Sequence, residues 1–312
     1  MSNFFSQLPS GLVSPIQQRV VDIILTEESG ISSGGDIFND QVSAEWRWDW
    51  VLPSQKQQFS GREELMQMIA KQSREVRYVN SLSLSFFPCE QLISATVIRK
   101  FIFNNHVCDD TSVYKIATED LRRSSRVTNL SRCLNPVQYS LEKHEVSAAD
   151  KAAQCAYLNL FAAKCRGDRE AVLLNLDDQV RCVFQSVVND ADYVEFDELL
   201  NKHDAVDFLG NNDIRWIDDV TLNFASVRGI IHVDYQCNVV MGQDDDLQNQ
   251  WNRHVVEGKD EISYRIDTLG NVLLTEIHSN EKCRLSPITE DEKFCILSFS
   301  QEGKEWLRTL KS

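Results

Sequence analysis

The sequence predicts an α+β protein made of two similar domains, and three observations support this fold class. The same order of elements occurs twice: a capped helix, a short strand, a second helix and a run of long strands. A repeat of this length indicates a duplicated domain. A chain of 312 residues is long enough for two domains that each bury a core. The strands alternate apolar and polar residues, which is typical of antiparallel sheets covered by helices on one face.

The composition disfavours several classes of partner. Hydrophobic residues make up 42% of the chain and charged residues 25%, as in globular proteins, and the net charge is −15. An acidic surface repels phosphate backbones and anionic lipids, so we expect neither nucleic acid nor a membrane as partner. The N-terminus lacks the pattern of a signal peptide, and no apolar run is long enough to cross a bilayer. We therefore expect a cytoplasmic or nuclear protein whose nine cysteines are reduced.

The first domain is predicted over residues 1–121. Ser14-Pro15 begins a helix, and Gln17 can complete its capping box. Residues 44–50 place three tryptophans at every second position, which predicts a strand with one apolar face. A capping box at residues 60–63 predicts the next helix. Alternating apolar residues then predict strands within 82–86, 93–103 and 113–118.

The second domain is predicted over residues 147–283, after a polar, irregular linker over 122–146 that contains Asn135-Pro136. Ser147 caps its first helix, which Gly167 ends. Asp168 can cap the short helix that follows, and Phe196, Leu199 and Leu200 mark another. Strands are predicted within 180–184, 220–224, 231–241, 262–266 and 272–277, the last two joined by a hairpin at Leu269-Gly270.

A C-terminal tail is predicted over residues 284–312, beyond the second domain. Residues 293–298 have the apolar pattern of a strand. Residues 303–310 look like a short amphipathic helix with Trp306, Leu307 and Leu310 on its apolar face. This apolar face can pack on its own chain or form a surface for a protein partner, and packing on its own chain is favoured.

Local motifs in both halves resemble the nuclear-transport-factor-2-like superfamily, which includes ketosteroid isomerase, scytalone dehydratase and SnoaL-like cyclases. They are turn and cap motifs, and the resemblance covers about residues 14–120 and 147–280. The carrying residues are Ala162 to Asp168, Asp177-Asp178, Tyr264 to Asp267 and Gly270-Asn271-Val272 in the second half, and Asn39-Asp40 and Phe59 to Glu64 in the first.

The resemblance implies two cone-shaped α+β barrel domains, each a curved antiparallel sheet wrapped around helices and enclosing an apolar cavity. It also implies an internal pseudo-dimer, because members of this superfamily commonly dimerise through the outer face of the sheet. A dry cavity can hold a carboxyl group with a raised pKa for acid–base chemistry next to a carbonyl.

Carried over to the second half, the resemblance predicts a non-catalytic domain. The isomerase type needs a tyrosine on the first helix, a base on the first strand and an acid on a late strand. Leu160, Val183 and Ile262 fall on these positions. Tyr157 lies one turn from the tyrosine position, where a role in the core is expected. An interior lined in this way offers no proton donor or acceptor.

In the first half, Glu45 falls on the base position and Asp49 lies on the same face of the strand. One interpretation makes Glu45 a catalytic base supported by Asp49. The other places Glu45, Arg47 and Asp49 on a solvated face while the tryptophans of the same strand fill the core. Burial of three tryptophans favours the second interpretation.

Other motifs carry little chemistry. Residues 30–34 match a serine nucleophile elbow, but they follow a helix and not a buried strand. His106, Asp109 and Asp110 are expected in a loop between strands. His232 and Asp234 share a strand face, which is expected to be polar and half exposed. No pattern fits a metal or a cofactor, so we expect neither; Asp244 to Asp246 lacks the spacing of a calcium loop.

Together these observations favour a non-catalytic protein-interaction or adaptor protein on a tandem cavity-type fold, with another protein as its partner. Two alternatives stay open. One is a small-molecule lyase, isomerase or cyclase that acts through the first domain. The other is a binding protein for an apolar small molecule.

Overall fold

A computed structural model describes the central and C-terminal parts of the chain in most detail. The described residues are 17, 21, 42–51, 56–60, 78–88, 92–103, 106–117, 127–137, 146–189, 194–210, 214–242 and 251–299. For most strands before residue 146, the description covers the backbone and its pairing.

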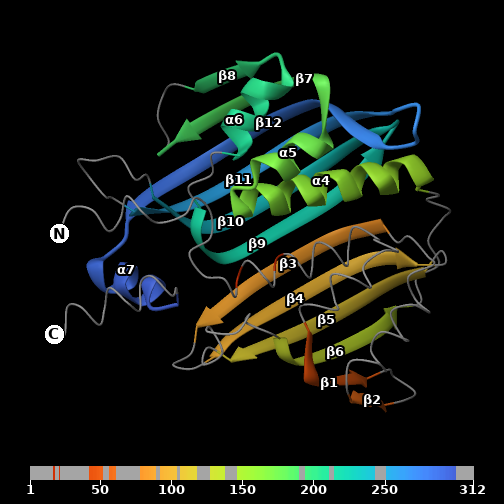
Figure 1. Ribbon diagram of the computed structural model, residues 1–312, viewed down its shortest axis with the longest axis vertical. Helices are drawn as coiled ribbons and strands as arrows, with labels where there is room; N and C mark the ends of the chain where they lie inside the picture. Colours follow the sequence, from red (N-terminus) through yellow and green to blue (C-terminus); the bar gives the residue numbers. More distant parts are fainter. Residues whose placement is uncertain are drawn as a thin grey trace.

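One sheet of 12 strands runs through the molecule (Figure 1). Its order is β2-β1-β6-β5-β4-β3-β9-β10-β11-β12-β7-β8. The strands before residue 146 are β1 (Val42–Val51), β2 (Lys56–Ser60), β3 (Tyr78–Pro88), β4 (Leu92–Phe103), β5 (His106–Ala117) and β6 (Val127–Val137). Those after it are β7 (Leu176–Val188), β8 (Glu195–Leu199), β9 (Ile214–Val227), β10 (Ile230–Gly242), β11 (Trp251–Ile266) and β12 (Val272–Pro287).

The strand order is the same in both halves of the sheet. In each half the first strand pairs with the second on one side and with the last on the other. The pairs β1–β6 and β7–β12 are parallel, and all other pairs are antiparallel. The expected all-antiparallel sheet is therefore wrong in one detail, because the chain returns to its first strand in the parallel sense.

The two halves meet edge to edge at the antiparallel pair β3–β9. Ser83 lies opposite Thr221, and their hydroxyl oxygens are 3.0 Å apart. The expectation that the halves would meet through the outer faces of separate sheets is therefore wrong. In the second half this outer face carries exposed polar side chains, which water solvates well: Asp234, Gln236, Glu257, Lys259, Glu261, Asn280 and Lys282.

Two buried glutamines join the halves reciprocally. Gln154 of the second half accepts a hydrogen bond from Val79 N (2.9 Å) and donates one to Val79 O (2.6 Å) on β3. Gln17 of the first half accepts one from Ile217 N (3.0 Å) and donates one to Ile217 O (2.7 Å) on β9. Each glutamine thus satisfies buried backbone groups of the other half, which are costly to leave unpaired.

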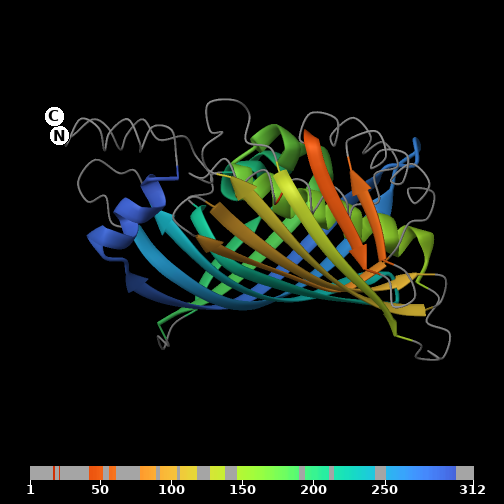
Figure 2. The same ribbon diagram turned by 90° about the horizontal axis from the view of Figure 1, so that it is seen from below.

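Three helices lie on the concave face of the second half, above the strands in Figure 2. They are α4 (Ala148–Arg166), α5 (Arg169–Asn175) and α6 (Lys202–Gly210). The sequence-predicted caps are confirmed for the first two: Ser147 Oγ accepts from Asp150 N, and Asp168 accepts from Ala171 N. Gly167 ends α4 with a φ of 65°, a left-handed conformation that glycine adopts without strain. None of the described helices has the length and apolar character to span a membrane.

Local patterns misplaced several elements. Phe196 and Leu199, expected in a helix, lie in β8, and α6 begins at Lys202 after Asn201 accepts a hydrogen bond from Asp204 N. The predicted linker over 122–146 contains β6, which pairs with β1 and β5. The loop expected at His106, Asp109 and Asp110 belongs to β5. In each case the pairing with strands distant in sequence decided the structure, and local sequence does not encode this pairing.

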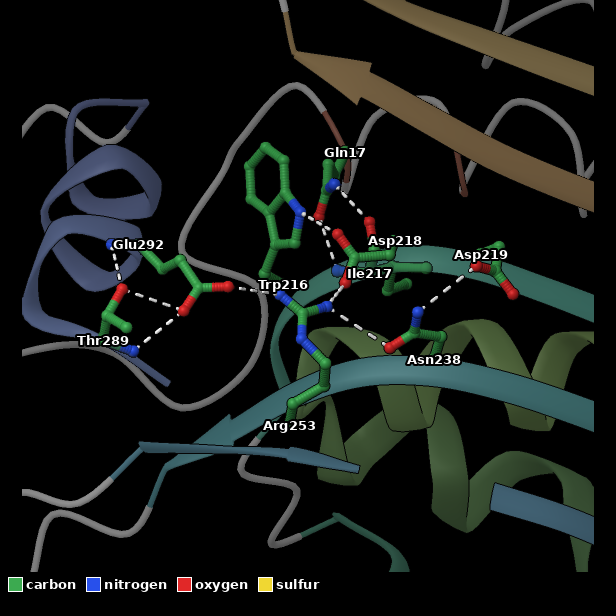
Figure 3. Close-up of polar contacts among 9 residues, drawn as sticks. All are labelled: Gln17, Trp216, Ile217, Asp218, Asp219, Asn238, Arg253, Thr289 and Glu292. Carbon is green, nitrogen blue, oxygen red and sulfur yellow. Dashed lines mark hydrogen bonds and ion pairs between the residues drawn. The ribbon is translucent and has the colours of Figure 1, made fainter. Parts of the chain in front are cut away.

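Residues 293–297 of the segment expected as a strand lie in helix α7 (Glu290–Leu297), and Ser298 is its C-cap. Thr289 and Glu292 form a capping box, which fixes the start of the helix. Figure 3 shows how α7 is tied to the sheet: Glu292 accepts a hydrogen bond from Arg253 (3.2 Å), which also forms an ion pair with Asp218. This part of the predicted tail therefore packs on its own chain, while residues 303–310 lie outside the described part.

Candidate functional site

A buried tyrosine–aspartate pair lies between α4 and the sheet of the second half. The Tyr157 hydroxyl donates a 2.7 Å hydrogen bond to Asp260 Oδ2. Tyr157 comes from the middle of α4, whose inner face packs on the strands, and its ring meets Phe224 of β9 edge to face. Asp260 comes from β11, where it faces inward because it is two residues from the fully buried Ile262.

Burial makes Asp260 an unusual carboxyl group. Its residue is only 8% exposed, and desolvation raises its pKa. The Ser279 hydroxyl, the Tyr157 hydroxyl and the charge of Lys164 act in the opposite direction, and burial outweighs them. A carboxyl group of this kind takes up a proton more readily than an exposed one and can then donate a hydrogen bond.

The second oxygen of this carboxyl group has no hydrogen-bond partner within the described part of the chain. Asp260 Oδ1 is buried, whereas Oδ2 already accepts from Tyr157. In the protonated carboxyl group the proton therefore belongs on Oδ1. An unpaired buried donor costs about 1–3 kcal/mol, which an acceptor oxygen from outside the chain would recover.

A row of three residues across the strands extends this polar cluster. Tyr235 on β10, Gly258 on β11 and Glu281 on β12 are paired in register. A Cβ atom on Gly258 would lie 2.3 Å from Tyr235 Cζ, so only glycine lets the ring cross β11. The Tyr235 hydroxyl donates to Glu281 Oε2 (3.0 Å) and lies 3.2 Å from Ser279 Oγ.

A second tyrosine–aspartate pair in the same half behaves differently. The Tyr264 hydroxyl donates to Asp150 Oδ1 (2.8 Å), and Ser147 Oγ donates to Asp150 Oδ2 (2.8 Å). Burial raises the pKa of Asp150, but hydrogen bonds from Tyr264, Ser147 and Ser226 together hold it below the usual range. Asp150 therefore stays ionised, which identifies Asp260 as the group suited to a neutral role.

The thiols of this interior are not poised as nucleophiles. Burial raises the pKa of Cys237 to about 12 and that of Cys283 to about 11. The Cys283 sulfur lies 3.5 Å from His254 Nδ1, but burial lowers the pKa of this histidine and keeps it uncharged. A thiolate–imidazolium pair is therefore not favoured here.

The expectation of an interior without proton donors or acceptors is wrong. Leu160, Val183 and Ile262 are buried at the three positions where the resemblance implied functional groups. Asp260 lies two residues before Ile262 on the same strand, and Tyr157 lies one turn before Leu160 on α4. The sequence does contain a signal for Asp260: it lies two residues before Ile262, so both side chains point to the same face of the strand. This signal is easily missed, because Asp260 stands between Lys259 and Glu261 and looks like part of a solvated face.

Of the other predicted site residues, only His232 and Asp234 have side chains in the described part, and both lie outside this cluster. Glu45 and Asp49 lie on β1, and their side chains are outside the described part. Residues 30–34, Asp244 to Asp246 and the predicted partner surface of Trp306, Leu307 and Leu310 are also outside it. His232 lies 3.6 Å from Glu261, and Asp234 lies 3.3 Å from Lys259, so these two form separate exposed contacts.

A resident metal ion has no evident site in the described residues, since none of their histidine, cysteine and carboxylate side chains gather in groups of three or more. When Asp260 is protonated, the cluster can donate a hydrogen bond from its carboxyl group, whose orientation is fixed by Tyr157. Such a donor suits the carbonyl or developing oxyanion of an apolar molecule.

The described fold is α+β, with a curved mixed sheet covered on its concave face by helices. No protein-family model matches the chain, and no curated protein matches it. Over about 45% of its length the chain is similar in structure to the ketosteroid isomerase-like and SnoaL-like fold.

Two solved structures represent this similarity. One is a ketosteroid isomerase-like protein from Erwinia carotovora atroseptica SCRI1043, with a TM-score of 0.31 and 9% identity over 44% of this chain and 98% of that one. The other is a putative SnoaL-like polyketide cyclase from Shewanella putrefaciens CN-32, with a TM-score of 0.29 and 9% identity over 45% of this chain and 90% of that one. At this identity the likeness concerns the fold alone.

Proposed function

We propose that the chain holds two copies of one nuclear-transport-factor-2-like unit. The identical strand order of the two halves supports this proposal. So does their reciprocal contact: Gln17 and Gln154 are 137 residues apart, and their targets Val79 and Ile217 are 138 apart. Near-equal offsets are expected if one unit was duplicated and the copies are related by a twofold axis.

We further propose that the second copy binds an apolar small molecule that carries a carbonyl oxygen. The observation that carries this proposal is the buried, unpartnered Oδ1 of Asp260, whose carboxyl group is oriented by Tyr157. The neutral acid donates to the carbonyl oxygen of the ligand, and apolar side chains of α4 and the sheet contact its body. The adjacent Tyr235 is fixed by Glu281 and limits how far the ligand reaches along β11.

The experiment compares two ligands of the same shape. 2-Acetylnaphthalene has a carbonyl oxygen where 2-isopropenylnaphthalene has a methylene group. Titrations followed by NMR of ¹³Cγ-labelled aspartate are expected to shift the Asp260 signal with the ketone. Binding of the alkene is expected to be at least about fivefold weaker, since one hydrogen bond to a neutral acid is worth about 1 kcal/mol or more.

Variants at the two tyrosine–aspartate pairs complete this test. Asp260→Leu is expected to abolish the preference for the ketone, whereas Asp260→Asn retains a donor at the same place and keeps most of it. Asp150→Asn, at the pair with the ionised carboxyl, serves as the matched control and leaves the preference unchanged. Equal binding of both ligands, or a preference that survives in Asp260→Leu, would overturn the proposal.

A second candidate function is that of a protein-interaction or adaptor protein. The observation in its favour is the set of exposed apolar side chains at the outer end of the second half, where Phe196 is 56% exposed and Leu200 is 64% exposed. Single exposed apolar residues are ordinary, but a group of them in and next to an edge strand is typical of an interaction surface. Affinity capture with wild type and with Phe196→Ser, compared by mass spectrometry, tests whether a partner depends on this surface.

A further inference from the structure

The last strand of the sheet, β8, has an edge that no described strand covers. Among the described strands it pairs only with β7, and it lies at the end of the strand order (Figure 1). An edge strand presents backbone N–H and C=O groups that can pair with an added strand. Natural proteins usually protect such edges, so the side chains that β8 presents decide what it can accept.

The side chains of this edge combine apolar groups with free carboxylates. Val194, directly before the strand, is 54% exposed, and Phe196 is 56% exposed. Arg181 forms an ion pair with Glu198 (2.8 Å). Glu195 and Asp197 are exposed and form no ion pair within the described part of the chain. The edge therefore offers apolar contact area and unbalanced negative charge together.

A second copy of this chain is a poor occupant of the edge. Antiparallel pairing of two β8 strands around their centre would place Asp197 opposite Asp197, with Glu195 and Glu198 of each copy nearby. Like charges directly opposite each other destabilise a strand pair. The charge of the edge thus selects against self-association and for a basic partner.

We propose that β8 is a docking edge for an extended segment of another protein in which apolar and basic side chains alternate. The segment adds a strand next to β8, with backbone hydrogen bonds supplying affinity and alternate side chains supplying specificity. Its lysine or arginine side chains meet Glu195 and Asp197, and its apolar side chains cover Phe196. This inference rests on the second candidate function and is independent of the Asp260 site.

The probe is an acetylated and amidated eight-residue peptide of alternating valine and lysine with a fluorescent label. Its binding to the full chain is measured by anisotropy at 0.15 M salt, where charges more than about 8 Å apart are screened. Hydrogen exchange then identifies the pairing. Strand addition is expected to slow the exchange of the β8 amides that point away from β7, and to leave the exchange of the β10 amides unchanged. The expected result is saturable binding with such protection.

Two controls separate strand addition from general attraction to an acidic protein. The same peptide with N-methyl groups on its alternate, β8-facing amides keeps every side chain but cannot form the ladder, and it is expected to bind at least tenfold more weakly. Asp197→Lys is expected to weaken binding at least tenfold, whereas Glu257→Lys, with the same change of charge on the exposed outer face, changes it less than twofold.

The outcomes distinguish this inference from the function on which it rests. Equal binding of the N-methylated peptide, or equal effects of Asp197→Lys and Glu257→Lys, would overturn the docking edge. Phe196→Ser and Leu269→Ser form a further pair, since Leu269 is exposed at the hairpin turn, and only the first should weaken binding. A partner captured from cells that is insensitive to Phe196→Ser would leave an adaptor function standing and exclude β8 as its site.

Discussion

At the scale of single residues, two hydrogen bonds of the same chemical kind have opposite outcomes. Tyr157 donates to Asp260 and Tyr264 donates to Asp150, at 2.7 and 2.8 Å. Asp150 gains further donors at the start of α4 and its pKa is lowered, whereas Asp260 has few partners and its pKa is raised by burial. Deeper burial of Asp260 and the additional hydrogen bonds to Asp150 thus shift the two pKa values in opposite directions, although each carboxylate accepts from a tyrosine.

The two carboxyl groups are expected to make opposite contributions to stability as pH changes. Folded Asp260 holds its proton above the ordinary aspartate pKa of about 3.9, where the unfolded chain has lost it. Its contribution to the free energy of unfolding therefore falls as pH rises from about 4 towards its folded pKa. Asp260→Asn, measured by urea unfolding across this range, should lack this fall.

Asp150 provides the matched control for this measurement. Its lowered pKa means that the unfolded chain takes up a proton first, so its stabilising contribution is lost as pH falls below about 4. Asp150→Asn should therefore remove a dependence at the acid end only. The same pH profile for Asp260→Asn and wild type would show that Asp260 is ionised in the folded protein.

The sequence carried only part of this information. Tyr157 was correctly placed in the helix core, but a hydrogen-bond partner 103 residues away cannot be inferred from local spacing. Asp260 lies in a charged stretch of the sequence. That its side chain points inward follows only from its spacing of two residues from the buried Ile262. That Oδ2 accepts from Tyr157 of α4 while Oδ1 has no partner in the described part depends on tertiary packing, which no local pattern describes.

At the scale of elements, β10, β11 and β12 are coupled through a glycine. The Tyr235 ring crosses β11 above Gly258 to reach Glu281, so the glycine serves as space for a neighbouring aromatic side chain. A similar contact occurs at the end of β10, where a Cβ atom on Gly242 would lie 2.2 Å from Trp251 Cδ1. These contacts fix the register of the strands, since a shift by one residue would remove both spaces.

Gly258→Ala is expected to destabilise the protein by about 1–3 kcal/mol, because the added methyl group overlaps the Tyr235 ring. The measurement is urea unfolding of Gly258→Ala in the wild type and in a Tyr235→Ala background. Removal of the ring should abolish most of the cost, so the double-mutant cycle should give a large coupling energy. Additive effects of the two substitutions would contradict the packing described above.

Local signals predicted the elements that depend on local chemistry. The caps at Ser147, Gly167 and Asp168 and the hairpin at Gly270 are confirmed, because a few neighbouring residues determine them. β6, β8 and α7 were misassigned, since strand pairing and the capping box at Thr289 outweighed weak local patterns. Short apolar runs suit a helix and a strand equally well, and tertiary context decides between them.

At the scale of the whole molecule, the sequence predicted many of the strands, but not β2, β6 and β8 or the way the halves join. The edge-to-edge pairing of the halves depends on which strand lies at the edge of each half of the sheet. The sequence does not show the spatial order of the strands. The serines that alternate with Leu82 and Leu84 take part in this edge-to-edge pairing: Ser81 contacts Asn223, and Ser83 contacts Thr221.

The glutamine contacts predict how the halves unfold. Gln17→Leu and Gln154→Leu should each destabilise the protein by about 1–3 kcal/mol, since each substitution leaves a buried backbone N–H and C=O without partners. Gln185→Leu, at an exposed position of β7, is the matched control and should change the free energy of unfolding by less than about 0.5 kcal/mol. Similar effects at all three positions would exclude a special role for the two contacts.

The single covalent chain has a consequence for the two interiors. In the second half, Phe224, Val233 and Asp260 lie side by side on β9, β10 and β11. The corresponding row on β3, β4 and β5 of the first half is Phe86, Ala95 and Tyr114. In a dimer of identical subunits these positions would have to carry the same amino acids. On the proposed duplication, a single chain removes that constraint, so one half can carry a carboxyl group where the other carries a tyrosine.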